Sequence, residues 1–133
     1  MIGISDGDTL TVLQDSRQTK IRLAEIDAPE LGQPHGRRAK GHLSALCHGK
    51  RAQVAPITKD IYGRTVARVS CDGVDASTDL LRHGLAWVYD KHSTDKSLYR
   101  LQDEARSAGI GLWSESSPTP PWQWRKAAKT LSR

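Results

Sequence analysis

Phenylalanine is absent from this chain of 133 residues, and its aromatic side chains belong to four tryptophans and three tyrosines. A hydrophobic core must therefore rest on Leu, Val, Ile and Ala, with the tryptophans supplying bulk. No apolar run approaches the ~20 residues that a membrane-spanning helix needs, so we expect no membrane partner. We expect no signal peptide within this sequence; because its first motif begins close to Met1, an upstream segment can have been trimmed.

Cysteine is scarce, with Cys47 and Cys71 as the two examples. Their separation excludes a CxxC motif and a zinc knuckle, which leaves two free thiols or one disulfide. They would approach each other if residues 51–58 and 65–71 pair as a hairpin, but we expect free thiols.

The five histidines form no zinc motif, because none lies four residues from another on a predicted helix.

Positive charge exceeds negative charge, with a net charge of +5 and a pI near 9.5. That excess predicts an anionic partner, which can be a nucleic acid, a phosphate or an acidic surface. Charge alone does not choose among these partners.

The apolar pattern predicts short strands first, with helices inserted and appended. Strands are predicted at 9–13, 19–26, 51–58, 65–71 and 85–89, and helices at 37–47, 75–84 and 95–108, the last with Asp95 as its cap. This order is typical of an α+β or small-barrel protein rather than of alternating βαβ units. We expect one domain over residues 1–133, with a core at about 4–113 and a proline-, tryptophan- and lysine/arginine-containing tail at 114–133.

Three patches carry candidate chemistry: DGDT at 6–9, IRLAEIDAPE at 21–30 and DIYGR at 60–64. Asp8 and Asp27 can share a hard cation through oxygen, and such a cation polarises a phosphate oxygen. Arg22 and Arg64 can fork onto the same phosphate, which lysine cannot do. Glu30 can take a proton from an attacking water. The set suits cleavage of a phosphodiester.

Each patch also has a structural interpretation. An aspartate in an Asp-Gly turn more often shapes the turn than binds metal, and arginines on strands are usually solvated. The Tyr-Gly-Arg segment is equally typical of a hairpin turn. The aromatic and basic sequence PPWQWRK can stack on bases, but packing of its tryptophans on the core is the favoured reading.

In this order and spacing the patches resemble the staphylococcal nuclease (thermonuclease) family. The resemblance rests on DGDT at 6–9, IRLAEIDAPE at 21–30, DIYGRTVARV at 60–69, LLRHGLAWVY at 80–89 and GLW at 111–113. It implies an α+β protein with an OB-fold, a five-stranded Greek-key barrel with three α-helices. It also implies a calcium-dependent, sugar-nonspecific nuclease that cuts DNA and RNA to 3′-phosphate products, acts as a monomer and is secreted or periplasmic.

The same resemblance implies roles for single residues. Asp8 and Asp27 match the calcium-ligating carboxylates, and Ala28 stands where a backbone carbonyl ligates calcium. Arg22, Arg64 and Glu30 match the catalytic residues, Glu30 as the general base. Tyr62 matches a tyrosine beside the nucleotide pocket. The best-known member of the family has threonine in place of Ala28, so one hydroxyl is lost near the site while the carbonyl stays.

Two rival functions stay open. The first is a catalytically weak OB-fold module that holds single-stranded nucleic acid by charge and stacking. The second is a calcium-binding structural domain, which leaves both arginines unexplained. Because both acids, both arginines and the glutamate are present, we favour the enzyme.

Overall fold

The computed structural model describes residues 3–89 and 96–131. A mixed sheet runs in the order β1-β2-β3-β6-β5, with β7 paired to the far end of β6. Its strands are β1 (Gly3–Asp6), β2 (Thr9–Gln14), β3 (Arg17–Leu23), β5 (Ala52–Lys59), β6 (Thr65–Cys71) and β7 (Val74–Asp75). A second, two-stranded sheet pairs β4 (Ile26–Asp27) with β8 (Trp87–Val88).

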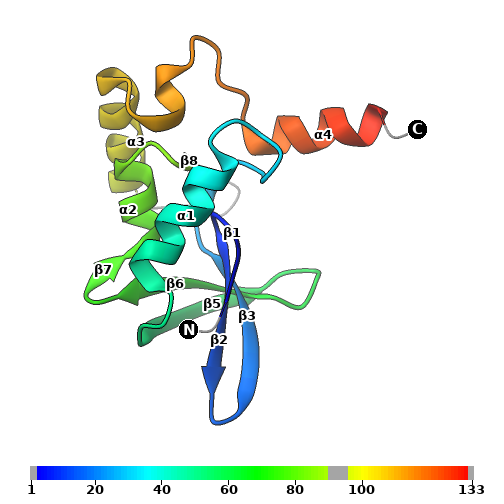
Figure 1. The fold of residues 1–133 in the computed structure, drawn as a ribbon, viewed down its shortest axis with the longest axis vertical. Helices are drawn as coiled ribbons and strands as arrows, with labels where there is room; N and C mark the ends of the chain where they lie inside the picture. Colours follow the sequence, from blue (N-terminus) through cyan, green and yellow to red (C-terminus); the bar gives the residue numbers. More distant parts are fainter. Residues whose placement is uncertain (1–2, 90–95, 132–133) are drawn as a thin grey trace.

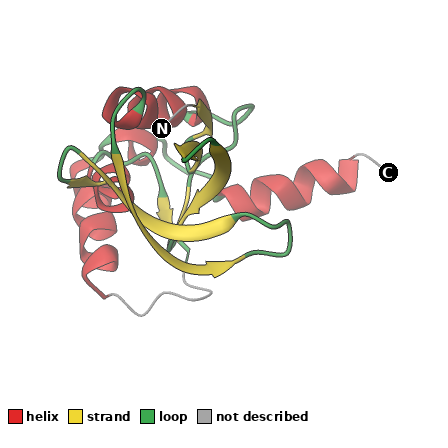
Figure 2. Cartoon of the chain, turned by 90° about the horizontal axis from the view of Figure 1, so that it is seen from below, coloured by secondary structure: helices red, strands yellow, loops and turns green. Residues whose placement is uncertain are grey.

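Helices lie along the curved sheet (Figures 1 and 2). They are α1 (Gly36–Cys47), α2 (Ala76–Arg82), α3 (Lys96–Ala108) and α4 (Pro121–Leu131), with a short 3₁₀ turn at Gly111–Ser114. The first three pack close to the strands, whereas α4 projects away from the body. No helix of the described chain is long and apolar enough to span a membrane.

The α+β class is confirmed, and the mixed sheet is consistent with an OB-fold. Two details of the expectation are wrong. The described strands form an open path from β1 to β5, so the sheet is not closed into a barrel. The described residues also contain four α-helices rather than three, because the tail forms α4.

Local chemistry explains where the elements begin and end. The β2–β3 hairpin turns at Asp15 and Ser16, both at positive φ (51° and 67°), as a tight two-residue turn requires. The predicted strand at 19–26 is interrupted before β4, where Glu25 has φ 70°. Helix α2 begins after Asp75, whose side chain accepts the Thr78 N–H. The Asp95 cap predicted for α3 lies outside the described residues.

The core holds leucine, isoleucine, valine and alanine side chains from both sheets and the first three helices, as the composition predicts. Trp87 packs edge-on against Trp113 and Trp122, with ring centroids 4.4 and 5.8 Å apart. Trp122 is nevertheless 37% exposed, so it covers the edge of the core without being buried in it, and the expectation that the tail's tryptophans complete the core remains a prediction.

The expectation of two free thiols is wrong. Cys47 and Cys71 form a disulfide with their Cα atoms 5.3 Å apart, and both residues are fully buried. The reason is the register of the β5–β6 hairpin, which sets Cys71 opposite Ala52. Cys47 ends α1 only a few residues before Ala52, so the two sulfurs meet under that hairpin.

Candidate active site

The DGDT patch forms the turn between β1 and β2, and it directs one carboxylate inward. Asp6 accepts the backbone N–H of Asp8 at 3.0 Å, so Asp6 shapes the turn. Gly7 lies against Ala28 and Ala39, where a Cβ atom would come within 2.6 to 2.8 Å of theirs. Asp8 is 5% exposed and accepts the Ala28 N–H at 2.7 Å. The turn therefore fixes Asp8 beside the residue that follows Asp27.

Arg22 on β3 joins the two aspartates that the sequence singles out. Its guanidinium lies 3.5 Å from Asp8 Oδ2 and 3.3 Å from Asp27 Oδ1. The same group donates to the carbonyl oxygens of Leu23 and Ile26. Arg22 is thus held on several sides, and the pairing of Thr9 with Arg22 in the β2–β3 ladder places it next to the turn.

A second guanidinium reaches this group from the other end of the chain. Arg125 on α4 contacts Asp27 Oδ2 at 2.7 Å and Glu30 Oε1 at 2.6 Å. The hydrogen bonds to Asp27 raise the pKa of Arg125 against the opposing effect of burial, and the bonds to Glu30 add to that rise. Asp27 is 1% exposed, so its charge is balanced by Arg22 and Arg125 instead of by water.

The loop that carries Glu30 is tied to the tail as well. Glu30 donates its backbone N–H to Gln33 Oε1 at 3.1 Å, and Gln33 donates its side-chain amide to the Thr119 carbonyl just before α4. This contact and the Arg125 pairs both hold the start of α4 beside the acids.

Arg64 and Tyr62 form a separate group at the β5–β6 hairpin. The Arg64 Nε atom donates to Asp60 Oδ2 at 2.6 Å, and the guanidinium lies 5.5 Å from the centre of the Tyr62 ring. Tyr62 is 77% exposed. Within residues 3–89 and 96–131, Arg64 makes no hydrogen bond or ion pair with Asp8, Asp27 or Glu30. The structure brings together five of the seven singled-out residues and places Arg64 and Tyr62 in their own group with Asp60.

Two aspartates near these arginines have shifted acidities. Burial, together with the nearby Asp8 carboxylate, raises the pKa of Asp6 to about 6. Burial acts the same way on Asp60, but hydrogen bonds from Arg64 and the Tyr62 amide outweigh it and hold the pKa of Asp60 below its usual value. Asp60 is therefore a stable anionic anchor for Arg64.

The donor atoms at the buried aspartates fit a hard cation. Asp8 and Asp27 offer carboxylate oxygens alone, and a single guanidinium already bridges them. Oxygen-only sets suit Ca²⁺ better than zinc or copper. A cation that binds Asp27 has to compete with Arg125 for the same carboxylate.

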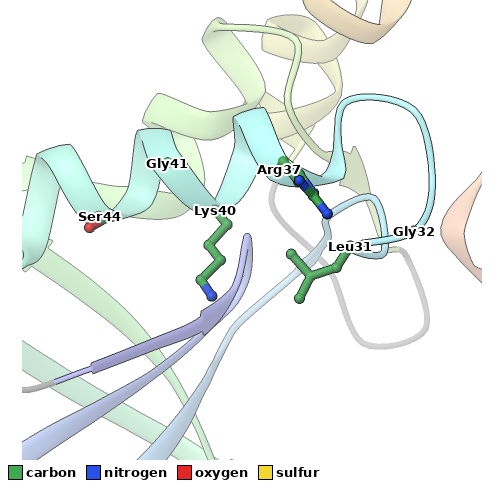
Figure 3. A pocket seen from close by; sticks show the side chains of 6 residues that line it. All are labelled: Leu31, Gly32, Arg37, Lys40, Gly41 and Ser44. Carbon is green, nitrogen blue, oxygen red and sulfur yellow. The ribbon is translucent and has the colours of Figure 1, made fainter.

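An open hollow of about 600 Å³ lies next to the Glu30 loop (Figure 3). Arg37 and Lys40 of α1 line it together with Leu31 and Gly32. The two cations give the hollow a positive character that suits an anionic strand. His35, from the same loop, lies instead against Glu115 of the tail, 3.4 Å away.

Sequence reasoning missed Arg125 and a second cluster. Arg125 sits in the basic tail, where a packing role for the tryptophans was the favoured reading. His42, Asp79 and His83 also meet, although no two histidines are four residues apart. The missed signal was the spacing of Asp79 and His83, which places both on one face of a helix.

Fold and site together describe an α+β protein in which arginine side chains stand beside buried carboxylates. The sequence model of the family described as "Staphylococcal nuclease homologue" matches residues 20–115. Because that segment is more than half of the chain, the chain belongs to the staphylococcal nuclease family, and as a member it is a nuclease.

Curated relatives agree with this membership. A protein of Shigella flexneri named "Micrococcal nuclease" is 36% identical over 143 residues, covering 99% of this chain and 82% of the relative. An "Uncharacterized endonuclease" of Escherichia coli O157:H7 is 40% identical over 126 residues, covering 94% and 82%. An "Uncharacterized endonuclease" of Haemophilus influenzae is 41% identical over 130 residues, covering 97% and 73%.

Proposed function

We propose that this nuclease is calcium-dependent and sugar-nonspecific, and that it hydrolyses DNA and RNA to 3′-phosphate products. The observation that carries the proposal is the pair of buried carboxylates, Asp8 and Asp27, which Arg22 bridges. Both offer oxygen atoms alone as metal ligands. Family membership supports nucleic acid as the substrate. Arg37 and Lys40, which line the neighbouring hollow, support an anionic strand beside the Glu30 loop.

Asp8, Asp27 and the Ala28 carbonyl are the proposed metal ligands. When bound there, Ca²⁺ supplies Lewis-acid polarisation of a phosphate oxygen. Asp27 meets two guanidiniums, so its carboxylate is already placed against positive charge. The loss of a hydroxyl at Ala28 leaves its carbonyl available, and the Ala28 N–H orients Asp8.

Arg22 and Arg64 are proposed to bind the phosphate as its negative charge grows. Arg22 is held by two backbone carbonyls and two carboxylates, so it is preorganised and needs little rearrangement. Arg64 is held by Asp60 through Nε, which positions the outer edge of its guanidinium for a second contact. Tyr62 is exposed beside it and offers a ring face to a nucleotide.

Glu30 is the proposed general base. It takes a proton from the attacking water at a carboxylate oxygen. The Arg125 contact at 2.6 Å occupies Oε1, so proton transfer through that oxygen requires Arg125 to move.

The metal is tested by digestion of plasmid DNA and of RNA with Ca²⁺, with Mg²⁺ and with a chelator. We expect cleavage of both substrates with Ca²⁺, little with Mg²⁺, which demands stricter geometry, and none in chelator. Asp8→Asn should weaken calcium binding measured by calorimetry, with Asp15→Asn in the exposed β2–β3 turn as the control. Full activity in chelator, or unchanged calcium affinity in Asp8→Asn, contradicts the assigned site.

Arg64→Lys separates the nuclease from a module that only binds. It keeps the charge and loses the planar fork. We expect kcat to fall at least ~100-fold, or about 2.7 kcal/mol, with a much smaller change in affinity for single-stranded DNA. Arg51→Lys, at an exposed residue just before β5, is the control. A parent protein that binds DNA and never cuts it with calcium present supports the binding module instead.

Export to an oxidising compartment and a monomeric state complete the proposal. The Cys47–Cys71 disulfide supports export, since such bonds persist outside the reducing cytosol. Its reduction should lower the free energy of unfolding by roughly 3 kcal/mol. A count of thiols on denatured, unreduced protein from the producing cell, with gel filtration for mass, tests both points. Two free thiols, or a dimer, contradict them.

A further inference from the structure

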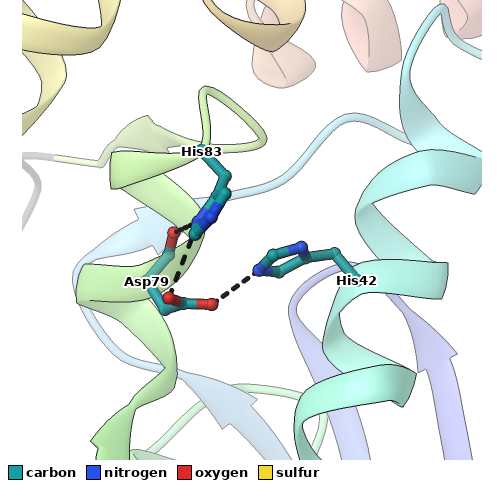
Figure 4. A group of neighbouring side chains, drawn as sticks. All are labelled: His42, Asp79 and His83. Atoms are coloured by element: carbon teal, nitrogen blue, oxygen red, sulfur yellow. Dashed lines mark hydrogen bonds and ion pairs between the residues drawn. The ribbon is translucent and has the colours of Figure 1, made fainter.

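A cluster of three metal-ligating side chains lies between α1 and α2, and it shares no residue with the acids of the active site. His42 comes from α1, and Asp79 and His83 come from α2 and its C-terminal cap (Figure 4). His42 Nε2 lies 2.5 Å from Asp79 Oδ2, and His83 Nδ1 lies 3.6 Å from Asp79 Oδ1. One ligand atom from each residue falls within 4.8 Å of the others.

Rigid elements hold two of the three ligands. His42 precedes Leu43 and Asp79 precedes Leu80, and both leucines are fully buried. Helix α1 is also joined to β6 by the Cys47–Cys71 disulfide. The relative position of His42 and Asp79 is therefore fixed by the core, as a preformed site requires.

The third ligand has room to adjust. Ligand atoms around tetrahedral zinc lie roughly 3.4 Å apart, given bonds of about 2.0 to 2.2 Å. The ligand atoms of the cluster now lie within 4.8 Å of one another. Rotation of the His83 side chain, which is 52% exposed, would bring them to the zinc spacing. Its Nδ1 atom now contacts the Asp79 carbonyl at 2.8 Å, and that contact is exchanged when Nδ1 binds a metal.

An ion pair alone accounts poorly for the arrangement. One carboxylate faces two imidazole rings whose centres are 4.4 Å apart. Protonation of both rings would set two positive charges against each other. A single divalent ion satisfies both neutral rings and the carboxylate at once.

We propose that His42, Asp79 and His83 bind one zinc ion that clamps α1 to α2. Two imidazole nitrogens and one carboxylate oxygen, with the fourth position left to water, form a zinc donor set. Calcium prefers oxygen ligands alone, so we expect calcium at the Asp8–Asp27 pair and zinc at the His42–Asp79–His83 cluster. The clamp stabilises the folded state, because zinc binds the assembled helices in preference to the unfolded chain.

The test is a calorimetric titration of the full chain with zinc chloride in the presence of saturating Ca²⁺. We expect one zinc per chain, and a melting temperature that rises by roughly 5–10 °C at a free zinc concentration of about 100 times Kd. His42→Gln and His83→Gln should each weaken zinc binding at least ~30-fold. His48→Gln, on an exposed residue at the end of α1, should leave it unchanged.

Circular dichroism without metal checks that the variants fold, and Asp79→Asn gives a third substitution if one of them does not. Visible absorption of bound cobalt(II) reports tetrahedral coordination independently of stability. Absence of zinc binding by the parent, or zinc binding that survives His42→Gln or His83→Gln, overturns the proposal.

Discussion

Two clusters of arginine and carboxylate side chains are built around arginines of the neighbouring strands β3 and β6. They differ in the other hydrogen bonds that their carboxylates make. The Arg68 cluster joins Arg68 of β6 to Glu25 and Asp75, at 3.0 Å each. The Arg22 cluster joins Arg22 and Arg125 to Asp8, Asp27 and Glu30. Asp75 also caps α2 through the Thr78 N–H, whereas within the described residues the side-chain carboxylate of Asp27 accepts hydrogen bonds from guanidiniums alone.

Burial and origin separate the two clusters further. The carboxylates of Glu25 and Asp75 retain 17% and 26% exposure, against 1% for Asp27. Burial opposes the charge of Arg68, but its bonds to Asp75 and Glu25 hold its pKa above the usual value. Asp27 instead depends in part on Arg125, which lies beyond the family-matched residues 20–115. We therefore expect Asp27 to exchange the guanidinium of Arg125, on the projecting helix α4, for a metal ion. The Arg68 cluster is instead expected to stabilise the fold.

The largest expected effect breaks the Arg22 cluster. Arg22→Lys keeps the charge and loses the fork, so we expect kcat to fall ~100-fold or more, about 2.7 kcal/mol, with a small change in KM. Arg68→Lys makes the same exchange in the other cluster and should leave kcat within about two-fold. Steady-state kinetics on single-stranded DNA with Ca²⁺ measure both. Equal losses of kcat in the two variants would contradict a catalytic role for the Arg22 cluster that the Arg68 cluster lacks.

A smaller effect is expected on stability at Arg68. Arg68→Met leaves Glu25 and Asp75 partly buried without this partner, so the free energy of unfolding should fall by about 2 kcal/mol. Catalysis by the folded fraction should persist. Urea unfolding provides the measurement, and Arg17→Met, on an exposed residue of β3, provides the control. A loss no larger than in the control contradicts a structural role.

The smallest effect concerns Arg125, which is 44% exposed. Its removal frees Asp27 and Glu30 from an ion pair worth about 1 kcal/mol or less, so Arg125→Ala should tighten calcium binding by up to roughly five-fold. Lys129→Ala removes the same charge from the exposed part of α4 and serves as the control. Calorimetry with Ca²⁺ decides the point, and weaker binding in Arg125→Ala would make Arg125 a support of the site instead of a competitor.

Much of the fold was predictable because its signals are local. The hairpin at 51–58 and 65–71 and the helix at 37–47 follow from apolar spacing and agree with β5, β6 and α1 to within a residue or two. The open sheet and α4 were not predictable in this way, because each depends on how distant segments pack. The approach of Cys47 to Cys71 did follow from the predicted hairpin, but the sequence alone did not show whether the two thiols are oxidised.

The residues of the candidate site also differ in how far the sequence alone predicted them. Asp8, Arg22 and Asp27 were singled out from their motifs, and the structure joins them through the ion pairs of Arg22, although Asp27 belongs to β4 in the second sheet. Arg125 was not predictable, because it contributes through a contact 98 residues from Asp27. The placement of Arg64 beside Asp60 also escaped prediction, since a hairpin turn and a phosphate-binding arginine have the same local sequence.

The parallel pairing of β3 with β6 has a consequence for the order of folding. It joins Ile21 to Thr65, whereas β2–β3 and β5–β6 are hairpins that need only short loops to close. Closing a long loop costs more entropy than closing a short one, so the hairpins are expected to form early and the β3–β6 seam later. The Arg125 pairs span a longer stretch of chain still. A chain emerging from the ribosome therefore has its hairpins before it has α4, and Asp27 receives its second guanidinium only after α4 has been synthesised.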